Sequence, residues 1–402
     1  MRHLIPARQH RPDKDVIFAL NAEATRRKQA SERIVNATIG SLMRDDGSLA
    51  ILDTVASLLQ QVPREEWAAY APIPGTPAYN QAVIDDTFAG HEALRQAATA
   101  VATPGGTGAL RHALMNYLES GQKMLTPSFY WGPYQTLCDE HERGLDTFSM
   151  FGADGQLDVA ALDAKLAAHL ATQGRVLLFL NDPCNNPTGY SMRRTEWRQV
   201  VERLLAHSER GPVTLLVDMA YFLYGTAADP RAFMRELEPL LGRVGLLFAW
   251  SGSKSFTHYG LRIGALLACE ADPQERHATQ AALAYACRGT WSNCTRGGLW
   301  AVTKLLTDPA LKARCDAERE TLKALLTARV DAFNALARPK GLHYPRYEGG
   351  FFVTVFTPDA EARAAAMRER GVYVVPQKGA VRVALCSVAE ADVSTLVEAL
   401  VA

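Results

Sequence analysis

The chain has 402 residues, of which 48% are hydrophobic, and its 43 Lys and Arg residues balance 43 Asp and Glu residues. A chain of this length can bury a large core. Its formal net charge is zero and it has no long basic stripe, which disfavours binding to nucleic acid or to an anionic membrane. Seven scattered cysteines, with no C-x-x-C pair, argue against a disulfide framework and a zinc site, so no metal is expected and a reducing cytoplasm is the simplest location.

The N-terminal region differs in character from the rest of the chain. Residues 1–50 are expected to form an N-terminal arm and part of a small domain. The first 35 residues are rich in arginine and lack a sustained hydrophobic period, so we interpret them as an arm that either packs on a partner subunit or is loose. Residues 1–8 are basic without the apolar core of a secretion signal, and no apolar run is long enough to cross a bilayer.

A large domain is expected over residues 51–300. A loop rich in Pro and Gly at 70–76 precedes an amphipathic helix that begins near Pro77. Farther on, Gly105, Gly106 and Thr107 open a helix whose first backbone amides could bind a phosphate, although such turns commonly do no more than begin a helix.

Short apolar runs alternate with helical patterns between about residues 120 and 270. Continuous rather than alternating apolar strands, separated by helices, indicate an α/β fold with a mostly parallel sheet covered by helices on both faces. The expected strands lie at 176–180, 213–217, 245–250 and 265–268, and the helices at 195–207 and 231–241.

Polar residues directly follow three of these runs. Asn181 follows the first, Asp218 the second, and the sequence Ser251-Gly252-Ser253-Lys254 the third. Because parallel strands place functional residues at their carboxyl ends, we expect these clusters to converge on one edge of the sheet.

A second, smaller α+β domain is expected over residues 301–402. A helical pattern continues from 296 to 333. Short strands then alternate with helices, the strands at 351–356, 372–375 and 381–385 and the helices at 360–370 and 393–402.

Lys254 is the residue with the most distinctive surroundings. It follows an apolar strand, with Ser251 and Ser253 before it and Arg262 after it. In a buried, electropositive site its amine could form a Schiff base with an aldehyde cofactor that carries a phosphate; otherwise it is a lysine extending from a helix start. Asp218 could keep the ring nitrogen of pyridoxal phosphate protonated, or it could simply cap a turn or helix.

Other residues could complete such a site. Tyr221 and Asn186 could hydrogen-bond the phenolic oxygen of the cofactor, and Trp131 could stack on its ring. The alternatives are a plain turn at 186–189 and a core tryptophan.

Two arginines could bind an amino acid substrate. Arg382 lies in an otherwise apolar strand, where an unpaired guanidinium would be costly, so it needs an anion such as an α-carboxylate. Arg288 is a second candidate, or else a surface arginine at a helix end.

Together these clusters resemble the class I aminotransferases of the pyridoxal-phosphate fold type I group, most closely the branch with aspartate and aromatic amino acid aminotransferases. The resemblance implies that Lys254 forms the Schiff base, that Asp218 and Tyr221 act with it in catalysis, and that pyridoxal 5'-phosphate is the cofactor. The implied cofactor-binding residues are Tyr70, Gly105, Gly106, Thr107, Trp131, Asn186, Asp218, Tyr221, Ser251, Ser253, Lys254 and Arg262. The implied substrate-binding residues are Gly40, Trp131, Asn186, Arg288 and Arg382.

Two of these matches belong, in that branch, to sites shared between subunits. Tyr70 resembles the tyrosine that reaches the neighbour's phosphate, and Arg288 the arginine that reaches the neighbour's substrate side chain. The resemblance therefore implies a homodimer.

The chain departs from the branch at three positions. Gly105 stands where a hydroxyl-bearing residue is usual, so that one phosphate hydrogen bond is lost or replaced by a backbone amide. Tyr134 and Asn185 each stand where a histidine is usual, which changes the surroundings of Asp218.

The resulting hypothesis is an aminotransferase that moves an amino group between an L-amino acid, dicarboxylic or aromatic or both, and a 2-oxo acid such as 2-oxoglutarate. A carbon–sulfur lyase or a decarboxylase on the same fold is the alternative. A non-catalytic cofactor-binding regulator would require a DNA-binding domain, and the N-terminal arm is too short and lacks a helix-turn-helix pattern.

Overall fold

A seven-stranded sheet is the centre of the larger lobe in the computed structural model, which describes residues 3–9, 11–12 and 15–402. Residues 1–2, which belong to the stretch considered above for a secretion signal, lie outside the described residues, as do 10 and 13–14 of the expected arm. In spatial order the strands are β2 (Ala98–Pro104), β8 (Ile263–Cys269), β7 (Gly245–Ser251), β6 (Val213–Asp218), β5 (Val176–Asn181), β3 (Lys123–Pro127) and β4 (Gly144–Phe148). Only β8 among them runs antiparallel to its neighbours. The prediction of a mostly parallel sheet is therefore confirmed.

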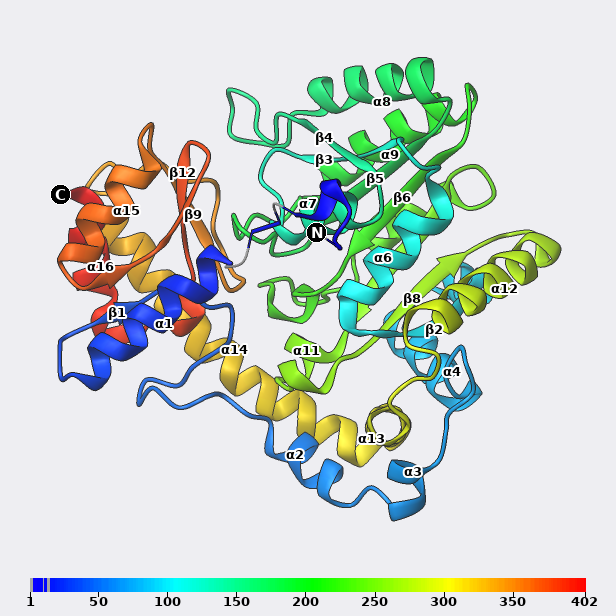
Figure 1. The fold of residues 1–402 in the computed structure, drawn as a ribbon, viewed down its shortest axis with the longest axis horizontal. Helices are drawn as coiled ribbons and strands as arrows, with labels where there is room; N and C mark the ends of the chain where they lie inside the picture. Colours follow the sequence, from blue (N-terminus) through cyan, green and yellow to red (C-terminus); the bar gives the residue numbers. More distant parts are fainter. Residues whose placement is uncertain (1–2, 10, 13–14) are drawn as a thin grey trace.

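Helices cover both faces of this sheet (Figure 1). Alternate residues of one strand belong to different apolar clusters: Leu216 of β6 packs on one side, whereas Leu215 and Val217 pack on the other. This arrangement explains why the strands read as continuous apolar runs. One face is covered by α6 (Gly105–Tyr117), α7 (Pro133–Glu140) and α12 (Pro273–Thr290), and the other by α4 (Pro77–Thr87), α8 (Val159–Gln173) and α9 (Arg194–Ser208).

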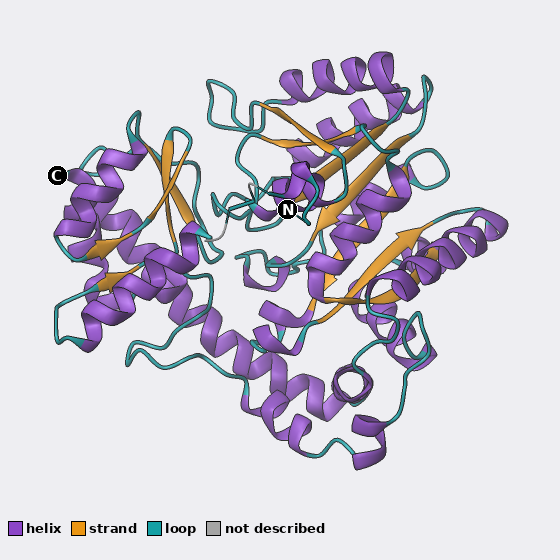
Figure 2. Cartoon of the chain, in the orientation of Figure 1, coloured by secondary structure: helices purple, strands orange, loops and turns teal. Residues whose placement is uncertain are grey.

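The smaller lobe is built on two small sheets (Figure 2). The first is antiparallel, in the order β11 (Val375–Gln377), β12 (Ala380–Val383) and β9 (Val353–Phe356); in the second, β1 (Val35–Asn36) pairs in parallel with β10 (Val372–Tyr373). The helices of this lobe include α1 (Val16–Gln29), α15 (Ala360–Glu369) and α16 (Val393–Val401). Because β1 comes from the start of the chain, residues more than 300 positions apart share this lobe.

Two local expectations differ from the structure. Residues 16–29, which lie in the stretch interpreted as an arm without a sustained hydrophobic period, form α1, and the side chain of Asp15 caps this helix. Only Ala24 of this helix is buried, so it has almost no apolar periodicity to reveal it. The helix expected at 231–241 is shorter, with α10 at Met234–Leu237 followed by a 3₁₀ turn, Glu238–Leu240, that contains Pro239.

A long helix joins the two lobes. The helical pattern after residue 296 is α13 (Arg296–Thr307) followed by α14 (Pro309–Ala337), which begins at the cap Asp308 with Pro309 in its first turn. α14 contacts α13 and α2 (Asp53–Gln60) in the larger lobe and α16 in the smaller one (Figure 1).

The remaining helical segments are short. They are α3 (Arg64–Ala68), α5 (Glu92–Ala97), α11 (Gly252–Ser255) and the 3₁₀ turns Pro6–Arg8, Phe222–Tyr224, Tyr259–Leu261, Leu385–Ser387 and Glu390–Asp392. In the described part of the chain, no helix combines the length and apolar character that crossing a bilayer requires. All seven cysteines are free and buried.

Candidate active site

The carboxyl ends of β5, β6 and β7 meet at one edge of the large sheet. In the strand register, Asn181 pairs with Asp218 and Asp218 pairs with Ala249, two residues before Ser251. The expected convergence of the three polar clusters is therefore confirmed. A cavity of about 150 Å³ lies at this edge, and its lining includes Gly106, Thr107, Trp131, Asn186, Asp218, Tyr221, Ser251, Ser253, Lys254 and Arg262.

Lys254 lies on α11, a single helical turn that begins directly after β7. Ser251 caps this turn, its Oγ accepting a hydrogen bond from the backbone amide of Ser253 at 3.3 Å. The Lys254 Nζ lies 5.2 Å from the centre of the Tyr221 ring. Burial lowers the pKa of Lys254 to about 8, with Asp218 acting in the opposite direction and Arg262 lowering the pKa further. A much larger fraction of this amine is neutral near pH 7 than for an exposed lysine, as a nucleophile requires.

The depressed pKa predicts that Lys254 destabilises the cofactor-free protein. Below pH 8 the amine is charged in both the folded and the unfolded state, so the full cost of burying it applies; between about 8 and the unfolded value of 10.5 that cost is lost. We expect Lys254→Met to raise the free energy of unfolding by roughly 2 kcal/mol at pH 7, allowing for water that reaches the amine through the cavity.

Urea denaturation of the cofactor-free proteins at several pH values measures this effect. The difference between Lys254→Met and the unmodified protein should shrink as the pH rises from 8 to 10.5. A difference that stays constant over this range would show that the pKa of Lys254 is not depressed.

Asp218 is held by three hydrogen bonds at the end of β6. The hydroxyl of Tyr134 donates to its Oδ2 at 2.7 Å, the backbone amide of Ala220 donates to its Oδ1 at 3.1 Å, and Asn181 Nδ2 donates to its carbonyl oxygen at 2.8 Å. Burial raises the pKa of Asp218, whereas the bonds from Tyr134 and Ala220 lower it. Burial also raises the pKa of Tyr134 well above its ordinary value, so this phenol remains a donor at every physiological pH.

Asn186 and Tyr221 form a buried pair. Asn186 Nδ2 donates to the Tyr221 hydroxyl at 3.3 Å, and the Asn186 backbone amide donates to Asn181 Oδ1 at 2.6 Å. Asn185 instead stabilises the turn, since its Oδ1 accepts hydrogen bonds from the amide and the hydroxyl of Thr188. Asn185 Nδ2 also donates to the carbonyl oxygen of Asn181 at 3.3 Å, whereas the side chain that hydrogen-bonds the carboxylate of Asp218 is Tyr134.

The N-terminus of α6 lies beside Arg262 and Ser251. The Gly105 backbone has a φ of +66°, and a Cβ at this position would lie 2.4 Å from Arg262 Nη2, so the approach of the guanidinium requires a glycine. The Gly105 amide donates to the Arg262 carbonyl at 3.0 Å and already has a partner in the chain. Arg262 Nη1 donates to Ser253 Oγ at 3.2 Å. Among the described residues no side chain caps the start of α6, and the first amides of a helix, which lack partners within it, suit an anion such as phosphate when a guanidinium lies beside them.

Arg382 lies in the middle of β12, buried, in the smaller lobe. Its Nη2 donates to the carbonyl oxygen of Thr38, its guanidinium carbon lies 4.7 Å from the centre of the Phe352 ring, and its Nε has no hydrogen-bond partner among the described residues. Burial lowers the pKa of Arg382. A buried guanidinium with a free N–H is suited to a carboxylate ligand.

Gly40 leaves room for the Phe352 ring that lies beside Arg382. A Cβ on Gly40 would lie 2.6 Å from Phe352 Cζ, so the Phe352 ring occupies the space that a side chain would need. The Phe352 ring centre in turn lies 5.6 Å from that of Tyr221. Phe352 therefore connects Arg382 to the Lys254 region. Sequence reasoning missed this role because it assigned Phe352 to a strand, whereas β9 begins only at Val353.

Tyr70 and Arg288 lie on an exposed surface and are not among the residues that line the cavity. Tyr70 is 88% exposed. Arg288 is exposed, with Nη1 donating to Ser292 Oγ at 3.0 Å. The segments that carry them are adjacent, because Asn293 hydrogen-bonds both backbone groups of Ala71.

Comparisons with known proteins agree with this geometry. Residues 33–400 match the family described as aminotransferase class I and II. An aromatic-amino-acid aminotransferase of Pseudomonas aeruginosa is 31% identical over 291 residues, which are 70% of this chain and 70% of that protein. An aspartate aminotransferase of the same organism is 26% identical over 382 residues, 91% of this chain and 92% of that protein. The solved structure of an aminotransferase from Anaerococcus prevotii has a TM-score of 0.94 and 30% identity, and the match covers 100% of this chain and 99% of that one.

Proposed function

The chain belongs to the aminotransferase class I and II family, and from this premise we propose how its residues divide the work of transamination. The protein is a pyridoxal-phosphate-dependent enzyme of fold type I that transfers an amino group between an amino acid and a 2-oxo acid. The family and its relatives do not favour a lyase, a decarboxylase or a non-catalytic regulator. The observation that carries the proposed residue roles is the partly buried Lys254, which lines one cavity together with Asp218 and Arg262.

The residues present fit the cofactor at each of its functional groups. The start of α6 at Gly106 and Thr107, with Ser251, Ser253 and Arg262, would hold the phosphate. Asp218 would face the ring nitrogen, Tyr221 and Asn186 the phenolic oxygen, and Trp131 one face of the ring. Gly105 would serve mainly by leaving room for Arg262. When bound, pyridoxal phosphate supplies an aldehyde carbon and a ring that accepts the electron pair left when the substrate Cα loses its proton.

The protein then orients the substrate and moves one proton. Arg382 would bind the α-carboxylate with two parallel hydrogen bonds, which fixes the direction of the Cα–H bond. Lys254 would take the proton from Cα and return it at the aldehyde carbon of the cofactor. A positioned base of this kind contributes about 10²- to 10⁴-fold to the rate. Asp218, with the hydrogen bond from Tyr134 to its carboxylate, would stabilise a protonated ring nitrogen.

The proposed substrates are dicarboxylic or aromatic L-amino acids with a 2-oxo acid such as 2-oxoglutarate. Relatives that are named for aromatic amino acids and for aspartate support this class. Arg288 would bind the side-chain carboxylate of a dicarboxylate. We expect Arg288→Ala to raise KM for aspartate or glutamate about 10- to 100-fold, because a charged hydrogen-bonding partner is lost, and to change KM for phenylalanine or tyrosine far less.

Steady-state kinetics with both substrate classes measure this difference. Arg288→Lys is the matched variant, since it keeps the charge but loses the paired donors, and its effect should be smaller. Equal increases in KM for both classes would remove Arg288 from the substrate site.

We also propose a homodimer with shared sites, since Tyr70 and Arg288 are both exposed and neither lines the cavity of its own chain. Mixing chains that carry Lys254→Ala with chains that carry Arg288→Ala tests this arrangement. If the partner supplies Arg288, each mixed dimer has one intact site and regains activity toward aspartate. Mixed dimers that form without regaining activity would place Arg288 in the site of its own chain.

The proposed location is the cytoplasm. It is supported by seven free thiols, the state expected in a reducing compartment. Fractionation of cells with an antibody against the protein tests the location.

A further inference from the structure

The carbonyl groups at the end of α11 have partners outside the helix. The last carbonyls of a helix lack partners within it, and α11 has only four residues. The Lys254 carbonyl accepts a hydrogen bond from the Tyr224 hydroxyl at 3.1 Å. The Ser255 carbonyl accepts one from Arg319 Nε at 2.9 Å, and Ser255 is only 2% exposed. Without Arg319 this buried carbonyl would lose a charged donor in a place with little access for water.

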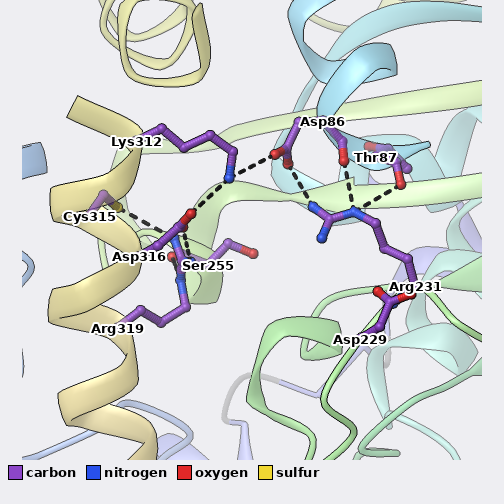
Figure 3. A network of polar contacts seen from close by, with 9 residues as sticks. All are labelled: Asp86, Thr87, Asp229, Arg231, Ser255, Lys312, Cys315, Asp316 and Arg319. Atoms are coloured by element: carbon purple, nitrogen blue, oxygen red, sulfur yellow. Dashed lines mark hydrogen bonds and ion pairs between the residues drawn. The ribbon is translucent and has the colours of Figure 1, made fainter. Parts of the chain in front are cut away.

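Arg319 is itself held firmly within α14. It is 6% exposed, its Nη1 lies 2.6 Å from Asp316 Oδ1, and its guanidinium lies 6.0 Å from the centre of the Phe256 ring. The ion pairs continue from Asp316 to Lys312 at 2.9 Å and from Lys312 to Asp86 at 3.3 Å (Figure 3).

The same network reaches a third part of the chain. Asp86 also pairs with Arg231 at 3.3 Å, and Arg231 Nε donates to the backbone carbonyls of Asp86 and Thr87 (Figure 3). A cavity of about 180 Å³ has Arg231, Lys312 and Arg319 in its lining, and each of these three basic groups has an acidic partner. We therefore interpret these ion pairs as a structural network that links α14 to α4 and α11, and not as a ligand site.

We propose that Arg319 is a positioning residue that fixes the direction of the Lys254 side chain by holding the Ser255 carbonyl at the end of α11. The inference rests on the proposed role of Lys254 as the residue that bonds the cofactor. Because Asp316 balances the charge of Arg319, we expect Arg319 to affect Lys254 through the position of the α11 backbone rather than through its charge. Among the described residues, the charged or titratable groups that shift the pKa of Lys254 are Asp218, Arg262 and Cys386, in addition to the effect of burial. Arg319 is not one of them.

Displacement of the lysine should slow the step in which it moves the proton. A displacement of about 1 Å at a reacting group can cost about 10²-fold in rate. Arg319→Met and Arg319→Lys should therefore lower kcat about 10- to 100-fold and change KM by less than about threefold. Arg314, exposed on the same helix, provides the matched control, and Arg314→Met should behave as the unmodified enzyme.

The decisive measurement compares kcat for an amino acid with hydrogen or deuterium at Cα, using the holoenzyme. In the Arg319 variants the isotope effect should be at least as large as in the unmodified enzyme, because proton transfer limits the rate more strongly. A kcat within about twofold of the control, or a lower kcat with a smaller isotope effect, overturns the proposal. If Arg319→Met does not fold, as judged by thermal unfolding, Arg319→Lys gives the same comparison.

A separate measurement distinguishes failure of this inference from failure of the proposed function. Borohydride reduction of the holoenzyme attaches the cofactor to the lysine that bonds it, and peptide mass spectrometry identifies that lysine. A label on Lys254 with unaltered kinetics in the Arg319 variants overturns this inference alone. A label on another lysine overturns the proposed role of Lys254 and this inference with it.

Discussion

Replacing Lys254 with alanine is expected to lower kcat at least about 10⁴-fold, because in the proposed mechanism the substitution would remove both the covalent attachment of the cofactor and the base that moves the proton. The residues proposed to hold the phosphate and the ring would remain, so the variant should still bind pyridoxal phosphate. Addition of an amino acid should change the absorbance of the bound cofactor once, without formation of the 2-oxo acid. Absorbance spectra combined with a product assay measure both parts of this result.

The control for this variant is Lys340→Ala, which replaces an exposed lysine after α14. It should retain normal kcat and normal cofactor absorbance. Substantial turnover by Lys254→Ala, with the control unaffected, would mean that another lysine carries the chemistry.

The second large effect is expected at Asp218. Asp218→Asn keeps the shape of the side chain but removes the buried negative charge that would stabilise a protonated ring nitrogen. Loss of one partner from a buried charge pair costs about 3–5 kcal/mol, which corresponds to a decrease in kcat of about 10²- to 10⁴-fold. Measurement of kcat together with a pH titration of the absorbance of the bound cofactor tests this expectation.

Tyr134→Phe is a milder change at the same site, and its effect on kcat can be compared with that of Asp218→Asn. It removes only the hydrogen bond to Asp218 Oδ2, and a hydrogen bond to a charged group contributes about 1.5–3 kcal/mol. We therefore expect kcat to fall about 10- to 100-fold. An effect of Tyr134→Phe as large as that of Asp218→Asn would show that the tyrosine contributes more than support for the carboxylate.

The parts of the fold that the sequence predicts are those with a strong local signal. The runs at 176–180, 213–217 and 245–250 are continuously apolar because both faces of β5, β6 and β7 are covered, and each run became a central strand. α1 was not predicted because its contacts with the smaller lobe leave only Ala24 buried. The helix is joined to the smaller lobe by polar contacts, in which Arg27 donates to the Tyr373 hydroxyl and that hydroxyl donates to Glu23, and no apolar pattern reveals such contacts.

The same distinction applies to the candidate site. Asp218, Ser251 and Lys254 follow strands directly, so the parallel sheet alone brings them together. The layer formed by Gly40, Phe352 and Arg382 comes from distant segments of the smaller lobe, and only the folded structure shows that an aromatic ring fills the space left by the glycine.

The burial of all seven cysteines has a practical consequence for the study of folding. Burial raises the pKa of Cys138 in the larger lobe and of Cys386 in the smaller lobe to about 12, so neither is a reactive thiolate in the native state. Alkylation of either thiol must wait until the surrounding structure opens. Mass spectrometry of the labelled peptides therefore measures the opening of each lobe separately, in the unmodified protein and without any introduced probe.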